Sequence, residues 1–184
     1  MKKETYRQAI HFFAGNAILC LAIIFGTQFA LAITVIAMIL GFAFSQQLLK
    51  KAKHPVKEIV ELVERDNESH LPGKAAFMLL FGIALTLFLF PDKTIAAAAI
   101  IALTYGDSAS TIIGKKFGKT KTDANRTVEG SIAGIAATFF FLMLFLKPNI
   151  AMTTAIIAML AEYLPVDDNL SIPLVTATAL SFLL

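Results

Sequence analysis

The chain has 184 residues, of which 57% are hydrophobic and only 16% are charged. Because about a quarter of the residues of a soluble domain are usually charged, this composition indicates a membrane protein. The formal net charge of +3 is too small to suggest a nucleic-acid-binding surface. The single cysteine, Cys20, excludes a disulfide framework and a cysteine-based zinc site.

Seven apolar segments follow one another along the chain, and most are long enough to span a bilayer as a helix. They cover about 8–26, 28–48, 73–90, 93–113, 129–147, 149–164 and 170–184. The first resembles a secretory signal in its basic start, but the chain continues directly into the second, so we expect it to be retained. Only helices satisfy the backbone of such long segments in lipid. The sequence therefore predicts one all-α domain over residues 1–184, a polytopic membrane bundle.

The basic residues predict how this bundle is oriented. If successive loops alternate between the two sides, one side holds the N-terminus, the 49–72 loop, the 114–128 loop and the 165–169 loop. That side then carries fourteen of the 16 lysines and arginines, and the other carries only Lys93 and Lys147. Since short cytoplasmic loops are rich in lysine and arginine, we expect a cytosolic N-terminus and an external C-terminus in the cell membrane.

The 49–72 loop contains a predicted helix of its own, at about 52–68. Val56, Ile59, Val60 and Val63 fall at the spacing of one apolar helical stripe. We expect this helix to lie at the cytosolic interface. A plain connecting helix and a lid over a site are equally compatible with the pattern.

Carboxylates are the first candidates for chemistry, because three groups of them come from different segments and face the cytosolic side. Asp107 ends the fourth segment, Glu129 opens the fifth, and an acidic turn over 162–169 lies between the sixth and seventh. A carboxylate within a membrane helix needs a partner. The partner of Asp107 is either a lysine of the next loop or a metal ion.

A metal is the sharper of these two interpretations. Mg²⁺ prefers one or two carboxylates together with phosphate oxygens and water. Asp107, Asp167 and Asp168 could supply a site for Mg²⁺ or Mn²⁺, with Asn169 as a neutral oxygen ligand.

Small residues predict that the fourth and fifth segments pack together. On the fourth segment they recur every four residues, at Ala98, Ala102, Gly106, Ser110 and Gly114. On the fifth they are Gly130 and Gly134, continued by Thr138. Such faces let membrane helices approach closely, and this contact would bring Glu129 near Asp107.

The basic loop 114–128 follows Asp107 and predicts a phosphate-binding wall. Its cations are Lys115, Lys116, Lys119, Lys121 and Arg126. The glycines at 114 and 118 allow a backbone to approach a ligand closely, and lysines bind phosphate as point charges. Positive-inside topology alone would explain two or three of the cations. Thr127 is a candidate N-cap of the fifth helix, with Glu129 in its first turn.

Carboxylates for a metal and cations for phosphates, at the cytosolic end of an apolar bundle, are the parts that phosphoryl transfer needs. A chain this short reaches little besides lipid, so the expected acceptor is a lipid. Three stretches, "YGDSASTIIGKKFGK", "NRTVEGSIAG" and "AEYLPVDDNLSIP", resemble the family of dolichol kinase, phytol kinase and CTP-dependent diacylglycerol kinase. "RQAIHFFAG" and "LPGKAAFMLLFG" match it more weakly, in the right order.

The resemblance implies transfer of the γ-phosphate of CTP, or another nucleoside triphosphate, to the hydroxyl of a polyprenol, phytol or diacylglycerol-like lipid. It implies catalytic roles for Asp107, Glu129 and Asp168. The resemblance and the residue patterns together predict nucleotide or phosphate binding by Gly114, Lys115, Lys116, Gly118, Lys119, Lys121, Arg126, Thr127, Ser131 and Asn169, with support from His11, Glu162, Gly130 and Gly134.

Two other functions remain open from the residues. A CTP-dependent cytidylyltransferase that makes a CDP-lipid also needs a metal and an acidic cytosolic site, but its usual signature residues are absent. A non-enzymatic transporter or lipid-binding protein would place charges near the midplane and repeat its halves, and neither feature is present in the sequence.

Overall fold

A computed structural model describes residues 2–50, 73–122 and 126–184, and these residues are almost entirely helical. The elements are α1 (Lys2–Phe25), α2 (Thr27–Lys50), α4 (Lys74–Leu89), α5 (Lys93–Ile101), the π-helix η2 (Ala102–Asp107), α6 (Ser108–Phe117), α7 (Val128–Leu142), α8 (Pro148–Leu160), the 3₁₀ turn η3 (Ala161–Tyr163) and α9 (Asp168–Leu183). The all-α prediction is confirmed, and each of the seven apolar segments contains a helix. The helix predicted at 52–68 lies outside the described residues.

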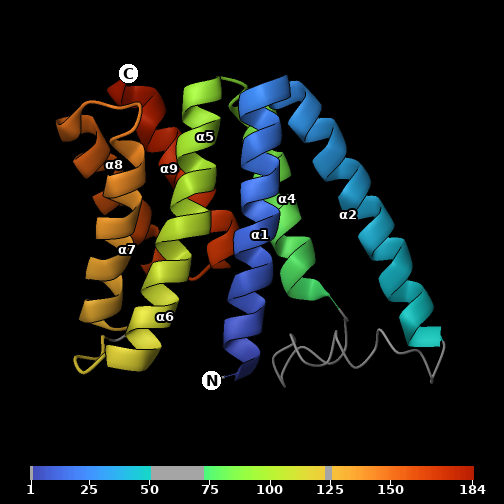
Figure 1. Ribbon diagram of the computed structural model, residues 1–184, viewed down its shortest axis with the longest axis horizontal. Coiled ribbons are helices and arrows are strands. Elements are labelled where there is room, and N and C mark those ends of the chain that lie inside the picture. The colour runs from blue at the N-terminus through green and yellow to red at the C-terminus, as the bar shows by residue number, and fades with distance from the viewer. Residues whose placement is uncertain (1, 51–72, 123–125) are drawn as a thin grey trace.

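The helices run side by side along one common direction, and α2 leans away from the others (Figure 1). The N-terminus and the connection between α6 and α7 lie at one end of the molecule. The C-terminus and the connection between α4 and α5 lie at the opposite end. Opposite ends for the two termini agree with the alternation of loops predicted from the sequence.

Two described helices are long and apolar enough to cross a membrane, judged by length and composition. They cover Tyr6–Phe25 and Lys93–Phe117, and the second is largely buried among its neighbours. Three further apolar helices, Thr27–Ala43, Lys74–Leu89 and Val128–Leu142, are shorter. The described structure is therefore a helical bundle, and seven spans are not established by it.

The central helix is a continuous run of α5, η2 and α6. Asp92 starts it, because its Oδ1 accepts hydrogen bonds from the backbone N–H groups of Thr94 at 2.9 Å and Ile95 at 3.0 Å. Four alanines, Ala96, Ala98, Ala99 and Ala102, are fully buried. Their small side chains let α1, α7 and α9 pack closely around this run.

The predicted contact between the small faces of the fourth and fifth segments is confirmed. A Cβ at Gly134 would lie 3.0 Å from the carbonyl oxygen of Gly106, and one at Gly130 would lie 2.7 Å from that of Ser110. One at Gly114 would lie 3.5 Å from the Cα of Gly130. Residues of increasing number along the central helix contact residues of decreasing number along α7, so the two helices pack antiparallel.

Candidate functional site

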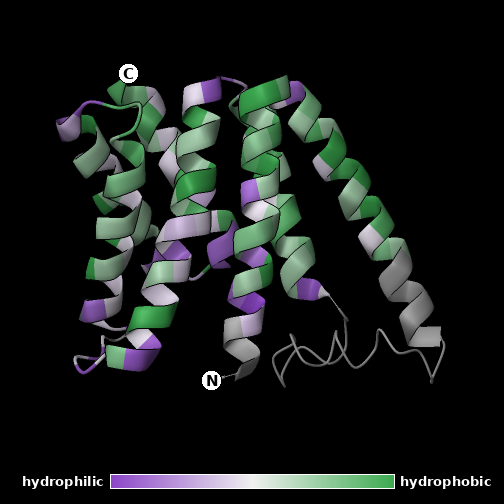
Figure 2. Ribbon diagram, in the orientation of Figure 1, coloured by the Kyte–Doolittle hydropathy of each residue, from purple (hydrophilic) through white to green (hydrophobic). Residues whose placement is uncertain are grey.

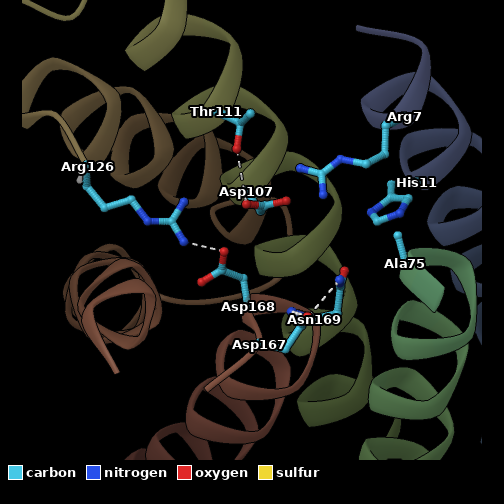
Figure 3. Close-up of a pocket in the computed structure, with 9 residues that line it drawn as sticks. All are labelled: Arg7, His11, Ala75, Asp107, Thr111, Arg126, Asp167, Asp168 and Asn169. Carbon is cyan, nitrogen blue, oxygen red and sulfur yellow. Dashed lines mark hydrogen bonds and ion pairs between the residues drawn. The ribbon is translucent and has the colours of Figure 1, made fainter. Parts of the chain in front are cut away.

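One polar pocket gathers side chains from five parts of the chain (Figure 3). Its lining residues are Arg7 and His11 of α1, Ala75 of α4, Asp107 and Thr111 of the central helix, Arg126 of the loop before α7, and Asp167, Asp168 and Asn169 at the start of α9. Hydrophobic residues cover most of the helices, and hydrophilic ones gather toward the end where the N-terminus lies (Figure 2). The pocket is thus a polar site inside an apolar bundle.

Asp107 occupies the last position of the π-helix and is only 7% exposed. Its Oδ1 accepts a hydrogen bond of 3.3 Å from the hydroxyl of Thr111, one turn further along the helix. The guanidinium groups of Arg7 and Arg126 lie on opposite sides of its carboxylate (Figure 3). The sequence offered a loop lysine or a metal ion as the partner of Asp107, and in the described structure two arginines lie beside it.

Arg126 reaches the pocket from the basic loop and forms an ion pair with Asp168. Two backbone hydrogen bonds join the two arms of this loop. The N–H of Thr122 donates to the Arg126 carbonyl at 2.9 Å, and the N–H of Val128 donates to the Thr120 carbonyl at 3.0 Å. Partial burial alone would lower the pKa of Arg126, but the charge and the hydrogen bond of Asp168 raise it above its ordinary value. The side chain therefore stays charged in the pocket.

The three aspartates predicted as metal ligands all line the pocket, but they do not form a cluster. No group of three or more His, Cys, Asp or Glu side chains that could hold a metal occurs among the described residues. In the described structure Asp168 forms an ion pair with Arg126, and Asp167 accepts hydrogen bonds from Asn169. Asp107 and Asp168 remain as the one or two carboxylates with which proteins hold Mg²⁺ beside substrate phosphates, so this donor set suits a metal that arrives with a phosphate.

The structure does not bring Glu129 to the pocket, although the helices that carry Glu129 and Asp107 do pack together. Both carboxylate oxygens of Glu129 accept hydrogen bonds of 3.2 Å from the backbone N–H of Thr120. Glu129 thereby closes the loop that carries Arg126. Thr127 is the N-cap of α7 as predicted, since its hydroxyl accepts from the N–H of Gly130 at 3.2 Å.

The predicted phosphate-binding lysines lie outside the pocket. Lys115, Lys116, Lys119 and Lys121 are exposed. A Cβ at Gly118 would lie 2.2 Å from the Gly114 carbonyl oxygen, and one at Gly114 would lie 2.8 Å from the Thr127 hydroxyl. The missing side chains of these two glycines therefore make room for helix packing rather than for a ligand.

The remaining predicted site residues support the bundle around the pocket. Glu162 is 3% exposed, and its Oε2 accepts a hydrogen bond of 3.0 Å from the Ser110 hydroxyl, which links η3 to α6. Ser131 shares a hydrogen bond of 2.9 Å with the Tyr163 hydroxyl. Gly130 and Gly134 form the helix contact described above. None of these four lines the pocket.

Arg7 and Thr111 are the polar pocket residues that the sequence did not predict, and Ala75 is the apolar one. Arg7 counted only as one of many cytosolic cations, and its side chain is 9% exposed. Its spacing of four from His11 places both on one face of a helix, which is the signal that could have found it. Thr111 is likewise four residues from Asp107, on the same face of the central helix.

Comparison with known proteins gives a relative over nearly the whole chain. The chain is 29% identical over 180 residues to "Uncharacterized protein MJ1137" of Methanocaldococcus jannaschii, and the match covers 95% of this chain and 91% of that protein. No family model matches the chain. No solved structure matches it either.

Proposed function

We propose that this protein is a membrane lipid-alcohol kinase that transfers the γ-phosphate of a nucleoside triphosphate to the hydroxyl of a lipid. The pocket carries the proposal: two arginines and two aspartates converge in one recessed site at one end of an apolar bundle. Phosphoryl transfer depends mainly on positioning and on stabilising charge. The resemblance noted in the sequence supplies CTP as the donor and a polyprenol, phytol-like or diacylglycerol-like lipid as the acceptor.

Each pocket side chain has a role that its chemistry suits. Arg7 and Arg126 would bind phosphate oxygens, because guanidinium groups donate several hydrogen bonds in a fixed plane. Asp107 and Asp168 would hold Mg²⁺ or Mn²⁺, which neutralises charge on the transferred phosphate when bound. Asp107, with two arginines around it, lies where the reacting groups would meet.

A membrane location is part of the proposal and is supported by the outer surface of the bundle. Large apolar side chains stay exposed on several helices, among them Phe13 (71%), Ile24 (69%), Leu40 (64%) and Phe140 (67%). A bilayer would cover these side chains, which water would otherwise surround. With the N-terminal end in the cytosol, the pocket would open toward cytosolic nucleotides and lie beside the membrane lipid.

A labelling experiment tests the function directly. Purified protein in detergent is incubated with Mg²⁺, a lipid alcohol and CTP labelled at either the α- or the γ-phosphate. We expect label from the γ position, and not from the α position, in the lipid product. A panel of a polyprenol, phytol and diacylglycerol identifies the acceptor class.

The other outcomes of this experiment point to the alternatives. Label from the α-phosphate, with a phosphatidic acid as acceptor, would identify a cytidylyltransferase and end the kinase proposal. Incorporation from neither position with any of the lipids would favour a lipid-binding or transport protein without enzymatic activity.

A further inference from the structure

Asn169 is a buried polar side chain whose acceptor is unused in the described structure. It lies in the first turn of α9, lines the pocket with Asp107 and Asp168, and is 8% exposed. Its side-chain oxygen, Oδ1, has no hydrogen-bond partner among the described residues. A buried acceptor without a partner is unfavourable, so the position indicates a ligand that the oxygen would bind.

The neighbouring Asp167 fixes which way this amide faces. Its Oδ1 accepts from the backbone N–H of Asn169 at 3.0 Å and from the side-chain Nδ2 of Asn169 at 2.9 Å. An ionised carboxylate only accepts hydrogen bonds, so the amide nitrogen must face Asp167. The amide oxygen is therefore turned away from Asp167, and the tip of the side chain points toward the pocket in Figure 3.

The backbone of Asn169 is held as tightly as its side chain. A Cβ at Gly82 of α4 would lie only 1.9 Å from the carbonyl oxygen of Asn169, so α9 packs directly against α4 at this residue. Asp167 is also the N-cap of α9. With both its backbone and its amide fixed, Asn169 presents its oxygen in one orientation before any ligand binds.

We propose that the amide oxygen of Asn169 is a ligand of a divalent cation shared with Asp107, and that Asp167 is a positioning residue and not a ligand. This inference rests on the proposed function, because the cation would be the one that accompanies the nucleotide phosphates. Mg²⁺ and Mn²⁺ take carboxylate and amide oxygens as ligands. Groups that hydrogen-bond a metal ligand orient it, and their loss typically weakens metal affinity about 10–100-fold.

A double-mutant cycle on Mn²⁺ affinity tests the two roles without measuring catalysis. The wild type, Asn169→Leu, Asp167→Asn and the double variant are purified in detergent. Binding of Mn²⁺ alone is measured by electron paramagnetic resonance of the free ion. Leucine matches the size of the amide and removes the oxygen. Asparagine at 167 still caps α9, but its neutral oxygen holds the Asn169 amide more weakly than the carboxylate does. Asp92→Asn, the same change at the cap of α5 at the other end of the molecule, is the matched control.

We expect Asn169→Leu to weaken Mn²⁺ binding at least tenfold, and Asp92→Asn to leave it unchanged. Asp167→Asn should weaken binding severalfold in the wild-type background and have no further effect when residue 169 is leucine. Additive losses would show that Asp167 binds the ion itself and would overturn its positioning role. Wild-type affinity in a folded Asn169→Leu protein would overturn the cation site.

Asn169→Asp keeps an oxygen at this position and guards against misfolding of the leucine variant. Its affinity for Mn²⁺ should exceed that of the leucine variant at least threefold, and an affinity no higher than that of the leucine variant would contradict the proposal. Failure of the lipid-labelling experiment with intact Mn²⁺ binding would reject the kinase activity alone. The two proposals can therefore fail separately.

Discussion

Asp107 is the residue on which the proposed chemistry depends most. It comes at the end of a run of apolar residues, and its carboxylate is buried between two arginines that lie more than a hundred positions apart in the sequence. The sequence predicted that Asp107 needs a partner, because burying a lone charge is costly. It did not predict that the partners are Arg7 and Arg126, since only the packing of α1 and the 114–128 loop decides which cations turn inward.

Asp107→Asn should abolish lipid phosphorylation while the protein still folds and inserts. Asparagine keeps the size of the side chain and its bond to Thr111 but removes the charge. Loss of one preorganised electrostatic group typically lowers kcat about 10²–10³-fold. We expect at least that loss in the γ-phosphate assay. A wild-type rate would refute a role for this carboxylate. Asp92→Asn, the same change at the far end of the molecule, should keep full activity.

Substitutions at Arg126 and Lys121, which belong to the same loop, test which of its cations bind phosphate. The sequence predicted that both the lysines and Arg126 of this loop bind phosphate, whereas among the described residues of the loop only Arg126 lines the pocket. Arg126→Gln should raise the KM for CTP about tenfold or more, since a charge-assisted hydrogen bond contributes about 1.5–3 kcal/mol. Lys121→Gln should leave KM within about twofold. Initial rates at varied CTP decide this, and the reverse pattern would restore the lysine interpretation.

At the scale of the helices, the strict spacing of four between the small residues also bears on the π-helix. Positions four apart advance about 40° beyond a full turn of an α-helix, so the face from Ala98 to Gly114 should wind away from a straight partner. The π-helix at Ala102–Asp107 has wider turns, which reduces this drift. Past the π-helix, Gly106, Ser110 and Gly114 all meet α7. The sequence predicted the contact but not the π-helix, which is rare and whose only signal is the strict spacing of four.

The glycines on α7 should matter for stability because of where a methyl group would lie. In Gly130→Ala the new Cβ would meet the Ser110 carbonyl at 2.7 Å, and backbone atoms can only move apart. Overpacking of this kind costs about 1–3 kcal/mol, which exceeds the gain of at most about 1 kcal/mol that alanine has over glycine in a helix. We expect a lower melting temperature in detergent.

Gly41→Ala is the matched control for this substitution. A Cβ at Gly41 of α2 has no heavy atom within 4 Å, so only the propensity gain applies. This variant should melt at the wild-type temperature or above it. Equal melting temperatures for the two alanine variants would show that the contact between α6 and α7 is looser than the structure indicates.

At the scale of the whole molecule, composition and loop charge predicted an all-helical bundle with its two ends chemically distinct. The described structure agrees in its helices and in its termini at opposite ends. Local sequence could not place Glu129, because its carboxylate is bound by the backbone of the loop before it instead of by the pocket. Nor could it show that Asp167 turns to Asn169, since that depends on how α9 begins.

The orientation of the bundle can be tested with single cysteines. Cys20 is replaced by alanine, and a cysteine is then placed at Lys121 or at Lys147. Lys121 lies in the connection before α7, and Lys147 lies in the connection after it. Because the loops predicted to share a side with the N-terminus carry nearly all basic residues, that side should be cytosolic. In intact cells a membrane-impermeant maleimide should label Lys147→Cys, and it should label Lys121→Cys only after permeabilisation. Labelling of Lys121→Cys in intact cells would show that the orientation is the reverse of the predicted one. Recovery of the protein in the soluble fraction would reject the membrane location, and with it the reason for expecting a lipid acceptor.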